Sequence, residues 1–211
     1  MHQKEAKHQK TGTGHLSHLS LVNSELIVGV DFTENKRVNE IINDPNLFPL
    51  VLYPGSDALT AQSAQLKTAV VANRTPAVFV IDATWFCAKK IMDKSLNLQK
   101  LPKISFLGNY TSIFTFKREP RPECVSTIES CYYLIKEMQK EGLSPQNKAE
   151  NNPEPLMTVF KEMIRYQLES ENRRIILGLP SRHGKDDKYQ TIKEIPDYLI
   201  TDVHVDSWND E

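Results

Sequence analysis

The hydrophobic positions of the chain form short apolar runs that alternate with segments in which apolar residues recur every three or four positions. Continuous apolar runs indicate strands buried on both faces, and the longer spacing indicates helices with one buried side. The runs predict strands at 26–32, 50–53, 76–82 and 104–107, with a fifth at 113–116. The helical spacing predicts helices at 15–23, 35–43, 58–69, 85–95, 127–141 and 156–169.

Strands that alternate with helices predict an α/β fold with a mostly parallel sheet and flanking helices. A chain of 211 residues suffices for one sizeable core, so we expect a single domain over 1–211. The polar, proline-containing segment 144–155 is expected to form an exposed linker within it. The chain turns acidic from Asp197, where we expect it to fray or pack loosely.

The composition narrows the classes of protein. With 25% charged residues and a formal net charge of -1, any RNA binding must come from local basic patches. No apolar run has membrane-spanning length and no signal-peptide pattern opens the sequence, so we expect a cytoplasmic protein without membrane partners. The three cysteines, at irregular spacing, predict reduced thiols, and we expect no metal site.

Two predicted strands end in residues that suit a ligand site, which in open α/β sheets lies outside the carboxyl ends of the strands. Asp82 directly follows an apolar run, where a carboxylate is costly unless it is hydrogen-bonded or used in chemistry. Beyond it, Thr84 can cap the next helix and Trp85 offers a stacking surface. A purely structural role for Asp82 and Trp85 explains this turn less well. The other strand end is Leu52-Tyr53-Pro54-Gly55-Ser56, which an ordinary turn explains equally well.

Two further segments combine polar groups with backbone that a ligand can approach. Ser126, Thr127 and Glu129 form a helix-start pattern, which is a complete structural explanation. The same helix start, with Arg118 nearby, would also suit a carboxylate or phosphate. Thr11-Gly12-Thr13-Gly14 is small and flexible, and its backbone can come close to a polar ligand.

These segments resemble, in the same order, the motifs of the DTW-domain proteins. Asp82-Ala83-Thr84-Trp85 matches the D-x-T-W motif of that family. Other segments resemble the family more weakly. Leu52-Tyr53-Pro54 is similar to its L-Y-P segment, Val125-Ser126-Thr127-Ile128-Glu129 to its L-S-T-x-E segment, and Arg118 to the arginine before that segment. His2-Gln3-Lys4-Glu5, with Thr11 and Thr13, is similar to its H-x-x-E and threonine-rich stretch. The resemblance runs from residue 2 to about residue 142.

The resemblance implies a tRNA-uridine aminocarboxypropyltransferase. Such enzymes transfer the 3-amino-3-carboxypropyl group of S-adenosylmethionine to N3 of a uridine in tRNA and release methylthioadenosine. It also implies a SPOUT-like fold with a C-terminal knot, an exception to the rule against knotted chains. Folds of this kind are often dimeric, so a homodimer is compatible with the resemblance. The cysteine-rich, zinc-binding segment that opens many family members is expected to be absent, since this sequence starts where that segment would end.

In this interpretation, the catalytic residues are Asp82, Thr84 and Trp85, with Asp82 removing the N3 proton and Trp85 stacking on the target base. The residues expected to hold the donor are Leu52, Tyr53, Pro54, Gly55, Ser56, Gly108, Ser126, Thr127 and Glu129. Those expected to bind RNA or the donor carboxylate are Glu5, Thr11, Thr13, Arg118 and Arg121, with Lys89, Lys90 and the basic segment 173–188 as further RNA contacts. An S-adenosylmethionine-dependent RNA methyltransferase and a non-catalytic RNA-binding module are the alternatives. A nucleotide hydrolase fits less well, because the sequence has no G-x-x-x-x-G-K-[ST] loop.

Overall fold

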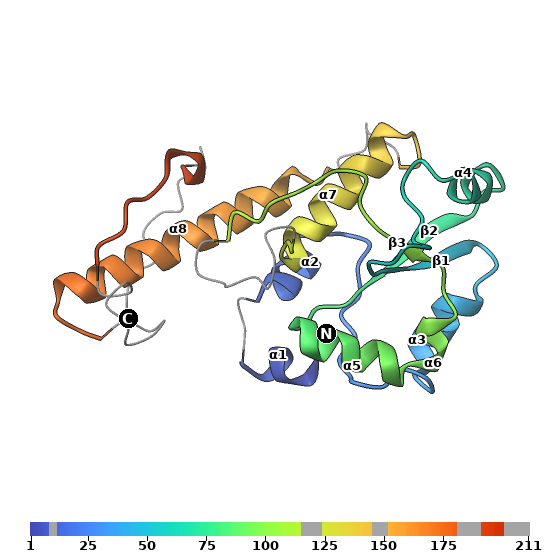
Figure 1. The fold of residues 1–211 in the computed structure, drawn as a ribbon, viewed down its shortest axis with the longest axis horizontal. Helices are drawn as coiled ribbons and strands as arrows, with labels where there is room; N and C mark the ends of the chain where they lie inside the picture. The colour runs from blue at the N-terminus through green and yellow to red at the C-terminus, as the bar shows by residue number, and fades with distance from the viewer. Residues whose placement is uncertain (9–11, 115–123, 145–151, 181–190, 201–211) are drawn as a thin grey trace.

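The structure is a computed structural model that describes residues 1–8, 12–114, 124–144, 152–180 and 191–200. Its centre is a parallel sheet of three strands in the order β2-β1-β3 (Figure 1). The strands are β1 (Leu47–Leu52), β2 (Thr75–Val80) and β3 (Lys103–Ile104). In the register, Leu52 of β1 pairs with Val80 of β2 on one side and with Ile104 of β3 on the other. The predicted α/β class, with a parallel sheet and flanking helices, is therefore confirmed.

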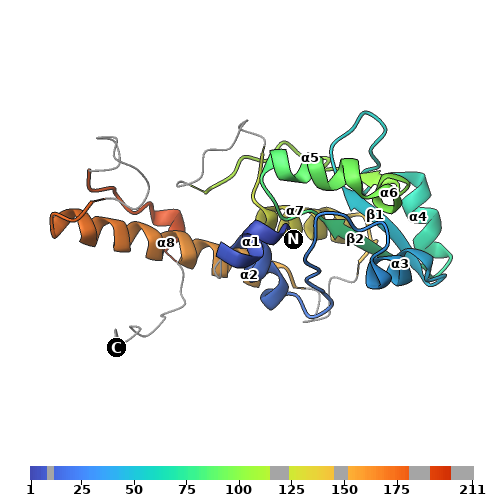
Figure 2. The same cartoon turned by 90° about the horizontal axis from the view of Figure 1, so that it is seen from below.

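Both faces of the sheet are covered by helices, which explains the continuous apolar runs (Figures 1 and 2). Leu50 and Val51 of the central strand are fully buried, and successive residues of a strand point to opposite faces. Val51 therefore belongs to a cluster with Val38 and Ile91, and Leu50 to a second cluster with Leu66. The first cluster involves α3 (Lys36–Asn43), α5 (Trp85–Lys94) and α6 (Leu96–Gln99), and the second involves α4 (Ala64–Val71) and α7 (Thr127–Lys140).

A third apolar cluster lies beside the sheet, where α7 packs on α8 (Glu154–Ile176) and α2 (Thr13–Ser20). α8 is 23 residues long and projects beyond the sheet as an arm (Figures 1 and 2). Its apolar stripe, which includes Phe160 and Ile164, is fully buried against Ile128 of α7 and Leu199. Leu199 lies in the short 3-10 helix η3 (Asp197–Leu199), so the prediction that the chain packs loosely from residue 197 is wrong for this turn. Residues 201–211 lie outside the described residues.

Three predicted strands are wrong or too long, and a carboxylate or another backbone segment explains each difference. Segment 26–32 makes a single bridge, between Gly29 and His2, and the chain turns at Phe32, whose carbonyl accepts from the N–H of Asn35. β3 stops at Ile104, since the N–H of Ser105 donates to the backbone carbonyl of Leu59 and the N–H groups of Leu107 and Gly108 donate to the side chain of Glu137. Residues 113–114 form no strand, since the N–H of Ile113 donates to Glu129, and 115–116 lie outside the described residues.

Helix boundaries differ less from the prediction. α3, α5 and α7 begin and end within a residue of the predicted ranges. α4 begins at Ala64 instead of 58, because Leu59 is held in a bridge with Ile104 of β3. α2 covers Thr13–Ser20 instead of 15–23, α8 begins within the proposed linker and runs seven residues beyond the predicted end, and α1 (Gln3–His8) and α6 were not predicted. Of the linker 144–155, residues 145–151 lie outside the described residues.

Candidate functional site

The carboxyl ends of the three parallel strands meet at one edge of the sheet, the edge at which open α/β sheets bind ligands. β1 runs into the segment that starts at Tyr53, β2 runs into Asp82, and β3 runs into the loop that contains Gly108. Three of the predicted site segments therefore share this edge. The backbone N–H of Tyr53 donates to the carbonyl of Ile104 over 3.1 Å, which fixes the first segment against the third.

Asp82 contacts residues from other sequence motifs. Its carboxylate Oδ1 accepts a hydrogen bond of 2.7 Å from the hydroxyl of Thr127, the first residue of α7. Asp82 and Thr127 are 45 residues apart in sequence and belong to the D-x-T-W and S-T-x-E segments. The hydrogen bond fixes one oxygen of the carboxylate to the start of α7, and the main-chain carbonyl of Asp82 accepts from the N–H of His2 over 3.0 Å.

Gly14 of α2 brings the third motif, the Thr-Gly-Thr-Gly segment, to the same carboxylate. A Cβ atom placed on Gly14 would lie 2.3 Å from Cγ of Asp82 and 2.4 Å from Oδ2. Any side chain there would overlap the carboxylate, so only glycine allows α2 to pack this close. The flexibility that the sequence suggested is not what this residue supplies; it supplies space, inside a regular helix.

Glu129 is fully buried and its carboxylate is filled by donors from the protein itself. Oε2 accepts from the N–H and hydroxyl of Ser126 at 2.8 and 2.6 Å and from the hydroxyl of Ser112 at 2.7 Å. Oε1 accepts from the N–H of Ile113 at 2.8 Å. A carboxylate has about four acceptor positions. Glu129 therefore caps α7 and holds the loop before it, and the predicted role in donor binding can only be indirect.

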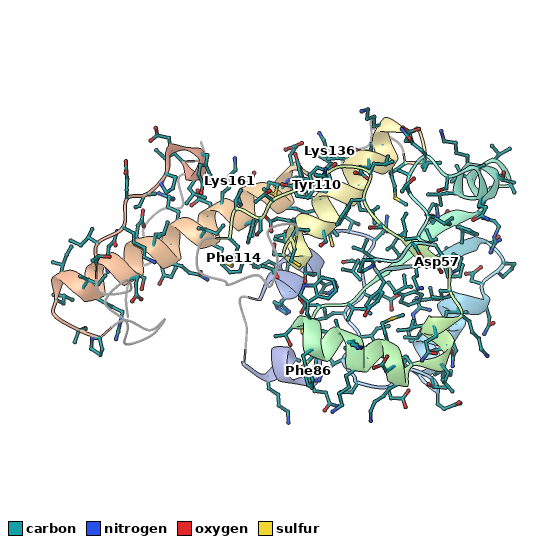
Figure 3. The ribbon with its side chains drawn as sticks, viewed as in Figure 1. Asp57, Phe86, Tyr110, Phe114, Lys136 and Lys161 are labelled. Atoms are coloured by element: carbon teal, nitrogen blue, oxygen red, sulfur yellow. The ribbon has the colours of Figure 1, made fainter. Side chains whose placement is uncertain are left out.

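Glu137, two turns further along α7, also binds loop N–H groups through its carboxylate. The sequence prediction did not include it. Its carboxylate accepts from the N–H groups of Leu107 and Gly108 and from the hydroxyl of Tyr110, all at 2.9–3.0 Å. Tyr110 lies beside α7 (Figure 3), where its ring stacks on that of Tyr133 at 3.9 Å. Burial and the neighbouring Glu137 charge raise the pKa of Tyr110 to about 12. The spacing of 129, 133 and 137 by four residues was the available signal, since it places all three on one helix face.

The turn after Asp82 starts α5. Thr84 caps the helix, with its hydroxyl oxygen 3.5 Å from the N–H of Cys87, as predicted. Trp85 is 43% exposed, so it is not a core residue. Phe86, which the sequence prediction did not single out, is 81% exposed at the beginning of the helix (Figure 3).

The segment after β1 forms the rim of this edge. Pro54, Gly55 and Ser56 are exposed, whereas Tyr53 is half-buried and burial together with the Asp93 charge raises the pKa of its hydroxyl. Lys103 forms an ion pair of 3.2 Å with Asp57, just beyond the rim. These residues share the sheet edge with Asp82, and none of them contacts its carboxylate among the described residues.

The remaining predicted residues are placed only in part. Thr13 begins α2, and its carbonyl accepts from the hydroxyl of Ser17. Thr11, Arg118 and Arg121 lie outside the described residues, as do the side chain of Glu5 and all of 181–188. Burial raises the pKa of the Cys131 thiol to about 11, so this thiol stays protonated at neutral pH and is not a nucleophile.

In the described part of the chain, no group of three or more His, Cys, Asp or Glu side chains is arranged to hold a metal ion. Nor is any described helix long and apolar enough to cross a membrane.

Fold and site together define an α/β protein with a polar site at the carboxyl edge of a parallel sheet, centred on one aspartate. The family model for the DTW domain matches residues 1–168, and the chain belongs to the DTW domain family. That family is linked to tRNA-modification enzymes. No curated protein and no solved structure matches the chain.

Proposed function

We propose that the chain transfers the 3-amino-3-carboxypropyl group of S-adenosylmethionine to N3 of a uridine in tRNA, with methylthioadenosine as the second product. The observation that carries the proposal is the Asp82 carboxylate of the family motif, held through Oδ1 by Thr127 at the ligand-binding edge of the sheet. Family membership supports a tRNA-modifying role, and the geometry of Asp82 supports its use in a proton transfer.

The chemistry needs a base, because uridine N3–H is a weak acid. In the proposed step, the carboxylate of Asp82 accepts the N3 proton. The N3 electron pair forms the new bond to the γ-carbon of the donor, the carbon–sulfur bond breaks, and its electron pair leaves with the sulfur. The positive sulfur of the donor becomes a neutral thioether, so charge balances when Asp82 has taken the proton. Before the step, the negative charge of Asp82 attracts the positively charged sulfonium of the donor. The charge of this residue therefore fits the donor.

Selectivity for the aminocarboxypropyl group over the methyl group requires that the donor be held in one orientation. The rim at Leu52–Ser56 and the Gly108 loop are the proposed donor contacts, because they flank Asp82 at the same sheet edge. Glu129 and Glu137 hold this loop through its N–H groups, so we assign them the shaping of the pocket. The proposal includes a SPOUT-like fold with a C-terminal knot, and roles for Arg118, Arg121, Glu5 and Thr11 in binding RNA or the donor carboxylate.

Asp82→Asn tests the proposed base directly. The amide keeps the size of the side chain and can still accept from Thr127, but it cannot take up the N3 proton. We expect turnover on tRNA to be abolished, while donor binding measured by calorimetry is retained and weakened only by loss of the attraction between the carboxylate and the sulfonium. Near-normal turnover in Asp82→Asn would remove Asp82 as the base, and loss of donor binding alone would reassign it to the donor site.

A further inference from the structure

α5 presents an exposed face beside Asp82 that its own fold does not use. The helix buries Ala88, Ile91 and Met92 against the sheet. On its other side Phe86, at 81% exposure, lies on one face with Lys89 and Lys90, three and four residues further on. We call these three residues the α5 stacking face.

Two observations separate this face from ordinary surface. A phenylalanine ring this exposed forgoes the energy of burial, and it directly follows Trp85, which is also exposed. The second observation is that Lys89 and Lys90 are exposed one turn from Phe86, and neither pairs with an acidic side chain among the described residues. Asp93, the acidic residue on the same side of the helix, lies one turn beyond Lys89 and Lys90 and forms no ion pair with either of them.

The position of the face fits the requirements of the proposed reaction. N3 lies on the edge of uracil that pairs, so the target base must leave its stack to reach Asp82. Its neighbour in the strand then loses a stacking partner. Phe86 follows Asp82 by four residues, so their Cα atoms are at most about 14 Å apart. An exposed aromatic ring at that distance offers the neighbouring base a replacement surface, and unpaired lysines one turn away suit its phosphates.

We propose that the α5 stacking face binds the nucleotide next to the target uridine, with Phe86 stacked on its base and Lys89 and Lys90 on the flanking phosphates. The inference rests on the proposed function, since it takes tRNA as the substrate, and it deepens that function by naming a specificity element. Stacking tolerates any base, so this contact favours an unpaired, flexible neighbour over a base held in a duplex.

The test is binding of bulk tRNA, measured by filter binding without donor, to Phe86→Ala, Phe86→Leu and Phe86→Trp. We expect the alanine and leucine variants to bind about five- to hundredfold more weakly, because stacking on a base is lost, and the tryptophan variant to bind as the unaltered protein does. The double variant Lys89→Ala/Lys90→Ala should reduce the slope of log affinity against log salt by about 1.4, for two phosphate contacts on a single strand.

Two variants serve as matched controls. Val71→Ala removes an apolar side chain that is 86% exposed at the end of α4, and Lys100→Ala removes an exposed lysine shortly before β3. Both lie toward the amino ends of the strands, away from Asp82. Neither is expected to change tRNA affinity or its salt dependence.

Unchanged affinity in Phe86→Ala, or no measurable tRNA binding by the unaltered protein, would overturn the inference. Full affinity in Phe86→Leu would overturn it as well, because an apolar contact would then suffice; sedimentation that shows a dimer lost in Phe86→Ala would assign the face to a second copy. A different result would contradict the proposed function. If tRNA binding depends on Phe86 but no methylthioadenosine forms, the stacking face stands and the transfer reaction does not.

Discussion

Gly14 offers the sharpest perturbation of the site, because a single methyl group changes the position of Asp82 without touching its chemistry. In Gly14→Ala the new Cβ would lie 2.3 Å from Cγ of Asp82, whereas ordinary contact begins at about 3.4 Å. The carboxylate must therefore move by about 1 Å, since the Cβ is fixed to a helix that packs on α7 and α8. That movement breaks or lengthens the 2.7 Å hydrogen bond from Thr127.

Two opposing terms set the effect on stability. Replacing glycine by alanine within a helix stabilises it by about 1 kcal/mol. A hydrogen bond to a charged group contributes about 1.5–3 kcal/mol. The free energy of unfolding of Gly14→Ala should therefore fall by about 0.5–2 kcal/mol. In an Asp82→Ala background the overlap is gone, and the same substitution should stabilise the protein by up to about 1 kcal/mol.

Urea unfolding measures this reversal of sign, and release of methylthioadenosine measures the catalytic effect. Displacement of a reacting group by about 1 Å lowers the rate about a hundredfold, so Gly14→Ala should lose nearly all turnover while remaining folded. Ser20→Ala, at the other end of α2, controls for changes in the helix, since its hydroxyl donates only to the carbonyl of Leu16. Full turnover in Gly14→Ala, or destabilisation of equal size in the Asp82→Ala background, would refute the placement of the carboxylate against α2.

Three further predictions follow from the carboxylate contacts. Thr127→Val removes the donor to Asp82 at nearly constant volume and should lower kcat about tenfold to hundredfold with little change in KM, whereas Thr127→Ser should restore it; equal activity of the two variants would show that the hydroxyl is dispensable. Glu129→Gln puts an amide N–H₂ among buried donors and should lower the free energy of unfolding by about 2–4 kcal/mol in urea, against a negligible change for the exposed Glu40→Gln. Because the pKa of Tyr110 is raised from 10.0 to about 12, by burial first and Glu137 second, the folded state holds this proton more tightly than the unfolded state. Its contribution to stability is complete below pH 10 and should be lost between pH 10 and about 12, and Glu137→Gln should shift an ultraviolet titration of the phenol to lower pH; a titration unchanged by that variant would contradict the contact.

The elements that the sequence predicted best are helices with a visible beginning. α3, α5 and α7 start after Asn35, Thr84 and Ser126, which are residues that cap helices, and their apolar stripes continue without interruption. The strands β1 and β2 were also found, because helices cover both faces of the sheet and Thr75, at the start of β2, is the one polar residue in them.

The predictions failed where side chains replace backbone partners. The apolar runs at 104–107 and 113–116 look like strands, but the carboxylates of Glu137 and Glu129 take the N–H groups that a neighbouring strand would use. The spacing of 129, 133 and 137 places these residues on one helix face, but it does not tell whether that face is buried or solvated. Gly14 is a second example. The Thr-Gly-Thr-Gly motif can be recognised in the sequence, but only the structure shows that the absence of a side chain at Gly14 makes room for Asp82.

The convergence on Asp82 was predictable in part. The parallel sheet implied that residues after β1, β2 and β3 would share an edge, and they do. The hydrogen bond from Thr127 was not predictable from the pattern, because the helix-start interpretation of Ser126–Glu129 was already complete. The roles assigned to Asp82 and Trp85 in chemistry stay predictions.

The identity of the two products decides whether the protein transfers the aminocarboxypropyl group. The purified protein is incubated with labelled S-adenosylmethionine and bulk tRNA, the tRNA is digested, and the nucleosides and the spent donor are analysed by mass. The account predicts a uridine that carries the aminocarboxypropyl group together with methylthioadenosine, and neither with Asp82→Asn. S-adenosylhomocysteine with a methylated nucleoside would show a methyltransferase, and unconsumed donor with unmodified tRNA would contradict an enzymatic role on this substrate.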